Sequence, residues 1–84
     1  MSRNSVEWLN KMKFKFSHHA QYRMYLREIS TLDVKDIINY PDFTEFQNNG
    51  KMLKVKYISD KGKVAVVYRM RGNEFIIITV YYED

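Results

Sequence analysis

The sequence contains no cysteine, and this absence excludes a disulfide scaffold, a thiol nucleophile and a zinc finger, each of which needs sulfur at fixed positions. Proline occurs once and glycine three times, so no linker or low-complexity segment divides the 84 residues. No apolar run approaches the roughly 20 residues of a membrane span, and residues 1–10 lack the apolar core of a secretory signal. We therefore expect one domain over residues 1–84, located in the cytoplasm and stabilised by packing alone.

The residues that are present favour a folded and weakly basic domain. Hydrophobic residues make up 45% of the chain and aromatic residues 15%, which is too apolar for a disordered segment. The 14 lysines and arginines exceed the 10 acidic residues and give a net charge of +4. An excess of positive charge favours polyanionic partners, so RNA is the partner class that the composition suggests first.

The first third of the sequence predicts a strand and a helix. Residues 5–11 have the pattern of a short helical turn. Charged and aromatic residues then alternate over Lys13–Phe16, which predicts a brief strand at the edge of a sheet. Ser17 is a predicted N-cap, because its hydroxyl can accept a hydrogen bond from a free N–H of the first helical turn. We expect the helix that it begins to run through Glu28.

A second helix is predicted from a capping box. Ser30 and Asp33 have the spacing at which each side chain can accept from the backbone N–H of the other. Val34 and Ile37 follow at the spacing of one helical face. The helix is expected to end before Pro41, because the residue that precedes a proline avoids the helical region.

After Pro41 the hydrophobic period changes to that of β-strands. The predicted strands are Asp42–Gln47, Met52–Ser59, Lys63–Met70 and Glu74–Tyr82. The segments between them, Asn48–Gly50, Asp60–Gly62 and Arg71–Asn73, are typical of hairpin turns. Together the elements predict an α+β domain of the order β-α-α-β-β-β-β, in which two helices pack on an antiparallel β-sheet.

The densest cluster of reactive side chains is on the first predicted helix. His19, Arg23 and Arg27 follow one another at intervals of four residues, so each lies about 40° around the helix from the last. This spacing fits a site in which an imidazole transfers a proton while guanidinium groups hold a phosphate. It fits equally well a pair of structural arginines that form ion pairs with carboxylates such as Asp33 or Asp36.

The sequence does not favour a metal site. His18 lies about 100° around the helix from His19, so the two imidazoles cannot share one ion as an i, i+4 pair can. The carboxylates show neither the HExxH pattern nor the spacing of a calcium loop. We therefore expect no metal and no cofactor.

A second cluster of positive charge surrounds the predicted strand Met52–Ser59. Five lysines and one acid, Asp60, lie between positions 51 and 63; the lysines are Lys51, Lys54, Lys56, Lys61 and Lys63. Lys54 and Lys56 share one face of the strand, which leaves that face wet and allows a patch that follows a phosphate backbone. The alternative is a solvated edge strand whose lysines deter aggregation.

One set of residues has the spacing of a known family. The segment from His19 to Val34 fits the pattern H-A-x-x-R-M-x-x-R-x-I-S-x-x-D-V, and the closing strand contains the sequence Ile-Thr-Val-Tyr at positions 78–81. On these residues the chain resembles the bacterial domain-of-unknown-function family 4258 over about residues 15–82, which leaves residues 1–12 as a short N-terminal extension. The family commonly has glycine after the second arginine; here Glu28 stands there and is expected to extend the helix.

The resemblance implies a fold similar to the RelE-like branch of small metal-independent ribonucleases, and it implies RNA cleavage in a toxin-like protein. His19, Arg23 and Arg27 match the polar positions of the signature, whereas Thr79 and Tyr81 match the closing strand. Such cleavage needs a base for the ribose 2′-hydroxyl, an arginine for the charge on the phosphorane and an acid for the leaving oxygen. The resemblance thus implies that His19 is base or acid and that Tyr81 is an auxiliary hydrogen-bond donor.

Two other functions stay open at this point. One is a non-catalytic module that binds RNA or the ribosome through the lysines between positions 51 and 63. The other is a protein-interaction domain with an antitoxin-like partner, in a toxin–antitoxin pair or a phage accessory system. Cleavage of RNA in the presence of EDTA distinguishes the enzyme from both.

Overall fold

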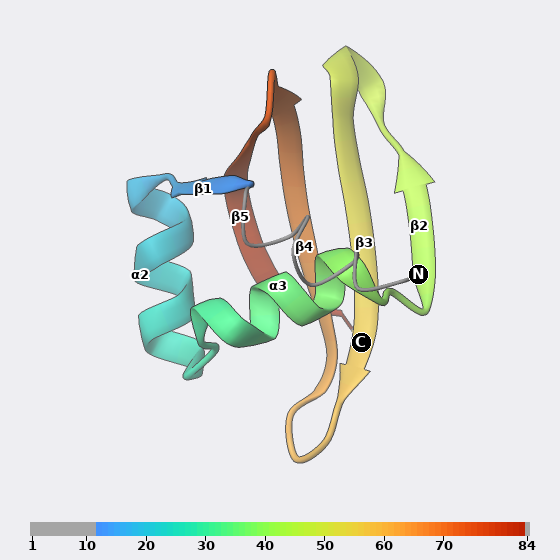
Figure 1. The fold of residues 1–84 in the computed structure, drawn as a ribbon. Coiled ribbons are helices and arrows are strands. Elements are labelled where there is room, and N and C mark those ends of the chain that lie inside the picture. Colours follow the sequence, from blue (N-terminus) through green and yellow to red (C-terminus); the bar gives the residue numbers. More distant parts are fainter. Residues whose placement is uncertain (1–11, 84) are drawn as a thin grey trace, which may run out of the picture.

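Two α-helices and five β-strands follow one another in the predicted order within residues 12–83 (Figure 1). The structure is a computed structural model that describes these residues, so the helical turn predicted over residues 5–11 lies outside the described part. The elements are β1 (Lys13–Phe16), α2 (His18–Arg27), α3 (Thr31–Asn39), β2 (Phe43–Phe46), a 3-10 turn (Asn48–Gly50), β3 (Lys51–Ile58), β4 (Gly62–Arg71) and β5 (Glu74–Tyr82).

The strands form one sheet in the order β1-β5-β4-β3-β2. From β2 to β5 each strand pairs antiparallel with the next one along the chain. β1 pairs in parallel with β5, from Lys13 opposite Glu74 to Phe16 opposite Ile77. The α+β fold and the edge position of β1 are confirmed, and the antiparallel prediction is correct for β2–β5. A parallel pair needs a long connection between its strands, and the chain between β1 and β5 supplies one.

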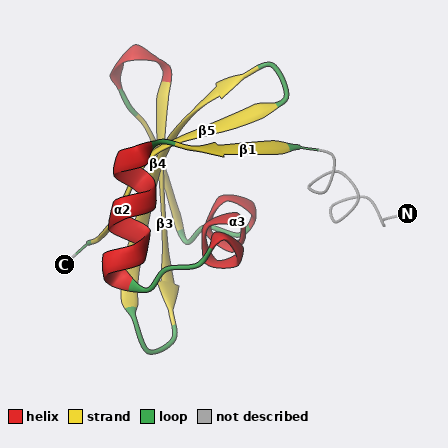
Figure 2. Ribbon diagram, turned by 90° about the vertical axis from the view of Figure 1, so that its left-hand side faces the viewer, coloured by secondary structure: helices red, strands yellow, loops and turns green. Residues whose placement is uncertain are grey.

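The helices cover one face of this sheet. α3 lies across β3 and β4, whereas α2 runs beside β5 (Figures 1 and 2). Side chains from α2, α3, β4 and β5 share one core of buried residues; we call it the helix-side core, and it includes Ala20, Met24, Val34, Ile37, Val64, Val66, Ile77 and Val80. Its aliphatic side chains supply most of the buried apolar area that stabilises the domain.

The opposite face of the sheet carries a smaller cluster. β4 is buried on both faces, because Ala65 and Val67 point away from the helices. They meet Leu53 and Val55 of β3, with Ile78 and Tyr81 packed against them. We call this face the open face, since neither helix contributes a residue to its cluster. It is therefore a second surface on which a site can be built.

Both ends of α2 are capped by local contacts. The Ser17 hydroxyl accepts from Ala20 N–H at 3.0 Å, as predicted. The helix ends at Arg27, and Glu28 has a φ of 57° in the left-handed region. Ile29 N–H donates to Met24 O at 2.9 Å, so the chain closes in a Schellman motif. The expectation that Glu28 extends the helix is wrong, because this position requires the backbone conformation that glycine adopts without strain.

The predicted capping box of α3 is confirmed. The Ser30 hydroxyl accepts from Asp33 N–H at 3.0 Å, and the Asp33 carboxylate accepts from Ser30 N–H at 3.1 Å. The helix ends at Asn39, two residues before Pro41, as expected. The hairpin segments also turn where predicted, with positive φ at Asn49, Gly50, Asp60, Gly62 and Gly72.

The left-handed residue at the end of α2 gives the first prediction. We expect Glu28→Gly to raise the free energy of unfolding by about 0.5–1 kcal/mol, because glycine relieves the cost of a positive φ and part of that gain is offset by its freer unfolded chain. Glu28→Ala retains the strain and serves as the control. Thermal melts of the three proteins provide the measurement; a glycine variant no more stable than the alanine variant would contradict the argument.

Candidate functional site

The three predicted site residues of α2 lie along one side of the helix. We call His19, Arg23 and Arg27 the α2 ridge. His19 and Arg27 are exposed and Arg23 is half-buried, while Ala20 and Met24 of the same helix point into the helix-side core. The ridge thus borders the buried face of α2 and presents one imidazole and two guanidinium groups to solvent.

The arginines of the α2 ridge have no carboxylate partner in the described chain. Arg71 with Glu74, at 3.6 Å, is the one ion pair of residues 12–83. Asp33, a predicted partner, instead accepts the Ser30 N–H in the capping box. The interpretation of Arg23 as a strut between the helices therefore has no ion pair to support it.

Arg27 has an aromatic contact with β5. Its guanidinium lies 5.5 Å from the centroid of the Tyr82 ring, and the Tyr82 hydroxyl donates to Arg27 O at 2.9 Å. The second contact supplies a donor to a carbonyl at the helix end. Together they hold the last turn of α2 against the end of β5 and orient the Arg27 side chain over an aromatic face.

Tyr81 does not join the α2 ridge. The pairing of β4 with β5 shifts between Val67 and Tyr68, which leaves Ile78 as an extra residue of β5. The extra residue changes which positions face the helices, so that Val80 lies in the helix-side core whereas Tyr81 packs against the open-face cluster. Tyr81 was predicted to assist the ridge, but the bulge turns its side chain to the opposite face of the sheet. The tyrosine that contacts the ridge is Tyr82.

Tyr81 lies in a different electrostatic environment from the ridge. Burial, and after it the carboxylates of Glu83 and Glu45, raise the pKa of its hydroxyl. Each of these effects opposes the charged phenolate. Thr79, opposite Val67 of the open-face cluster, stands on the same side of the sheet. The hydroxyl groups of Thr79 and Tyr81 therefore lie on the open face, whereas that of Tyr82 lies on the side of the helices.

The predicted lysine patch is divided by the fold. Lys54 Nζ donates to Ile38 O and Lys56 Nζ donates to Tyr40 O, each at 2.9 Å. Both ammonium groups thus meet the carbonyls at the C-terminal end of α3, where the helix dipole favours positive charge. Burial lowers the pKa of Lys54. The face predicted to be wet is the face on which α3 packs, and each of the two ammonium groups donates to a backbone carbonyl there.

The other three lysines lie at the two ends of the hairpin, Lys51 at one end and Lys61 with Lys63 at the other. Lys51 begins β3 opposite Arg69, whereas Lys61 is in the turn that joins β3 to β4. Lys63 is exposed at the start of β4, opposite Tyr57. The alternative of a lysine-rich edge strand is wrong, because β3 lies between β4 and β2. The five lysines thus lie in three places: on the helix side of β3 and at each end of the hairpin.

Two exposed aromatic residues of α2 were missed in the sequence. Tyr22 is 62% exposed and Tyr25 is 80% exposed on α2. Tyr22 follows His19 by three residues, so the two side chains are neighbours on the helix surface. The available signal was their distance around the helix from Ala20 and Met24, which places both tyrosines away from the buried stripe.

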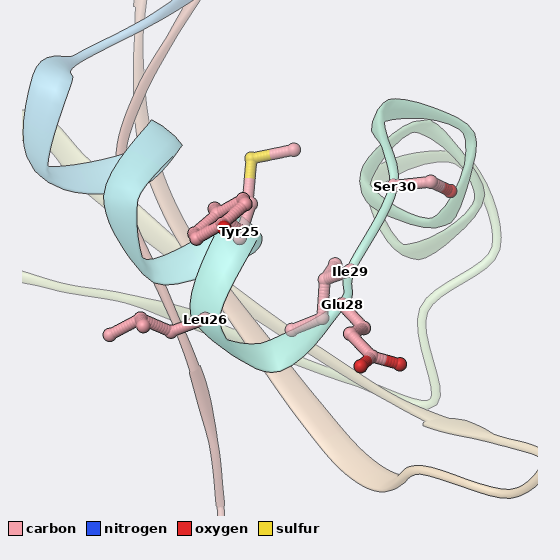
Figure 3. Close-up of a pocket in the computed structure, with 6 residues that line it drawn as sticks. Tyr25, Leu26, Glu28, Ile29 and Ser30 are labelled. Carbon is pink, nitrogen blue, oxygen red and sulfur yellow. The ribbon is translucent and has the colours of Figure 1, made fainter.

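A hollow lies beside Tyr25 at the end of α2 (Figure 3). Its walls come from the last turn of α2 and from the segment that leads into α3; the lining residues are Met24, Tyr25, Leu26, Glu28, Ile29 and Ser30. Leu26 and Ile29 make part of it apolar, and Glu28 is its one ionisable carboxylate. His19, Arg23 and Arg27 do not line this hollow, so it lies outside the α2 ridge.

Two further observations concern metal ligands and membrane-spanning helices in residues 12–83. No three histidine, aspartate or glutamate side chains in this part of the chain gather as ligands for a metal ion. Neither α2 nor α3 is long and apolar enough to cross a membrane.

Comparison with known families agrees with the resemblance found in the sequence. The model of the family Domain of unknown function (DUF4258) matches residues 16–82, and the chain belongs to this family. The match includes both helices and the strands β2 to β5. No curated protein and no solved structure matches the chain.

The contact of Lys54 with α3 gives a second prediction. We expect Lys54→Met to lower the free energy of unfolding by about 1–2 kcal/mol, because Ile38 O loses its donor while methionine keeps the apolar stem. Lys63→Met removes the same charge from an exposed position and should change stability by less than about 0.5 kcal/mol. Urea denaturation of both variants provides the measurement, and equal stabilities would show that Lys54 does not cap α3.

Proposed function

We propose that this DUF4258 protein binds single-stranded RNA along α2 and cleaves it without a metal ion. The observation that carries the proposal is the α2 ridge, in which Arg23 and Arg27 have no carboxylate partner among residues 12–83 and His19 is exposed beside them. Guanidinium groups that no protein carboxylate neutralises are available to a phosphate, which they can bind through two parallel hydrogen bonds.

Single-stranded RNA fits this surface better than a duplex does. Tyr22 presents an exposed ring next to His19. A base can stack on such a ring when it is not paired, and stacking contributes about 1–3 kcal/mol per base. A phosphate at the arginines and a base on Tyr22 would place the intervening ribose near the imidazole.

The proposed reaction is an internal transfer at phosphorus. The His19 imidazole takes the proton of the ribose 2′-hydroxyl, and O2′ forms a bond to phosphorus as the bond from phosphorus to O5′ breaks. The leaving oxygen takes a proton from solvent, so the products are a 2′,3′-cyclic phosphate and a 5′-hydroxyl. Arg23 and Arg27 stabilise the additional negative charge on the phosphorane.

The structure changes which residues the proposal uses. Lys54 and Lys56 are omitted because their ammonium groups cap α3, and Tyr81 is omitted because it packs on the open face. Tyr82 takes its place as the aromatic residue that orients Arg27. A RelE-like relationship belongs to this proposal as well; the packing of both helices on one face of a largely antiparallel sheet supports it.

The third prediction tests cleavage. Purified protein incubated with an unstructured RNA of mixed sequence and EDTA should yield fragments that end in 2′,3′-cyclic phosphate. His19→Ala should reduce the rate by about 100-fold or more, because the proton transfer is lost. His18→Ala is the matched control: this exposed imidazole lies about 100° around the helix and should leave the rate unchanged.

The outcomes of this assay separate the candidate functions. If the RNA is bound but stays intact, the protein is a non-catalytic binding module and not an enzyme. RNA that is neither bound nor cut would overturn the proposal and favour a protein-interaction domain. Loss of cleavage in both histidine variants would indicate a fault in folding, which circular dichroism of the variants detects.

The fourth prediction separates binding from stability at Arg23. We expect Arg23→Ala to change the free energy of unfolding by less than about 0.5 kcal/mol, because no carboxylate is left unpaired. Its RNA affinity should fall, with the slope of log affinity against log salt smaller by about 0.7 for one lost contact with a single strand. Arg69→Ala, an exposed arginine of β4, is the control for charge. Several degrees of destabilisation with an unchanged salt slope would make Arg23 a strut.

A further inference from the structure

One side of β2 is unpaired. The sheet order places β2 at the end opposite β1, and its inner side pairs with β3. No strand of residues 12–83 pairs with its outer side, and its four residues are all exposed. Natural edge strands are often covered, kept very short, or protected by charged residues, especially lysine, or by proline, because free backbone groups can pair with another chain. β2 has neither residue and instead exposes Phe43 by 53% and Phe46 by 80%.

The ladder with β3 determines which backbone groups point outward. Gln47 N–H donates to Lys51 O at 2.9 Å, so Glu45, two residues earlier, also directs its backbone groups to β3. The N–H and C=O groups of Thr44 and Phe46 therefore point away from the sheet. With one donor and one acceptor per residue, β2 offers two donors and two acceptors to an incoming strand.

The surface next to this edge is acidic, although the chain as a whole carries a charge of +4. Phe43 and Glu45 stand on the open face, opposite Val55 and Leu53 of its cluster. A hollow on this face is lined by Asp42, Phe43, Glu45, Val55, Lys63 and Glu83, which is three carboxylates against one ammonium group. The carboxylates of Glu83 and Glu45 also contribute, after burial, to the raised pKa of Tyr81.

We propose that β2 receives an extended segment of a different protein as a sixth strand, and that this segment alternates basic with apolar residues. Its backbone would bond to the outward groups of Thr44 and Phe46, in the manner of strand addition to a sheet edge. Its basic side chains would face Glu45 and the acidic hollow on the open face. Its apolar side chains would cover Phe46 on the side of the helices.

A second copy of this chain fits the edge poorly. When two β2 strands pair antiparallel with their faces in register, residues of one face must oppose residues of the same face. Glu45 would then oppose Phe43 or Glu45 of the other copy. Either register gathers the carboxylates of both copies without a cation from the incoming strand, which is unfavourable. Charge therefore selects a basic segment.

The test uses an eight-residue peptide that alternates valine with lysine and a matched peptide that alternates valine with glutamate. We expect the lysine peptide to bind the full chain and to slow hydrogen exchange of the Thr44 and Phe46 amides, measured by NMR. Thr44→Pro removes one outward donor, and proline is tolerated on a free edge. Its affinity should be about tenfold lower, whereas Thr44→Val, which keeps the N–H, should bind as the wild type does.

Charge is tested by Glu45→Lys, which should weaken binding of the lysine peptide about tenfold. Asp36→Lys, the same change on an exposed position of α3, should leave it unaltered. Equal binding of the two peptides, binding that survives Thr44→Pro, or protection of amides elsewhere would overturn the proposal. So would dimerisation of the wild type that Thr44→Pro abolishes, since the occupant would then be a second copy. None of these results depends on RNA cleavage.

Discussion

The junction between β1 and α2 at Ser17 determines where α2 lies on the sheet. Ser17 N–H donates to Ile77 O at 3.0 Å, and its hydroxyl donates to Ile78 O at 2.8 Å while it accepts from Ala20 N–H. β1 covers the edge of β5 as far as Ile77, where the pairing ends. At that point Ser17 donates hydrogen bonds to the carbonyls of Ile77 and Ile78. One side chain thus begins the helix and anchors it to the sheet, which sets α2 and its ridge beside the second half of β5.

The same stretch of β5 contains the bulge that separates the two faces. Before Ile78 the odd-numbered Ile77 faces the helix-side core, and after it the even-numbered Val80 does so. A regular strand would have turned Tyr81 toward α2, whereas the extra residue turns Tyr82 there. The contact between Tyr82 and Arg27 therefore depends on the bulge as much as on the identity of either residue.

The features that could be predicted from the sequence are those that depend on residues close together in the chain. The capping box at Ser30 and the hairpin turns depend on residues within a few positions, and each forms as predicted. The four-residue spacing of His19, Arg23 and Arg27 likewise places these residues on one side of the helix. The caps that Lys54 provides for α3 bring together segments 16 residues apart, and the bulge depends on the register of two strands. No local pattern encodes these contacts, so the lysine patch and the role of Tyr81 could not be judged before the fold was known.

The distribution of charge gives the two proposed surfaces independent access to their partners. The α2 ridge lies beside β5, whereas the acidic edge is β2, with β4 and β3 between them. Three strand spacings of about 4.8 Å separate the two strands by about 14 Å, which exceeds the screening length of about 8 Å at physiological salt. The attraction between a polyanion on α2 and a basic segment at β2 would therefore be weak. Under the two proposals, a partner on α2 and a partner at β2 would occupy the same domain together, with β3 and β4 between them.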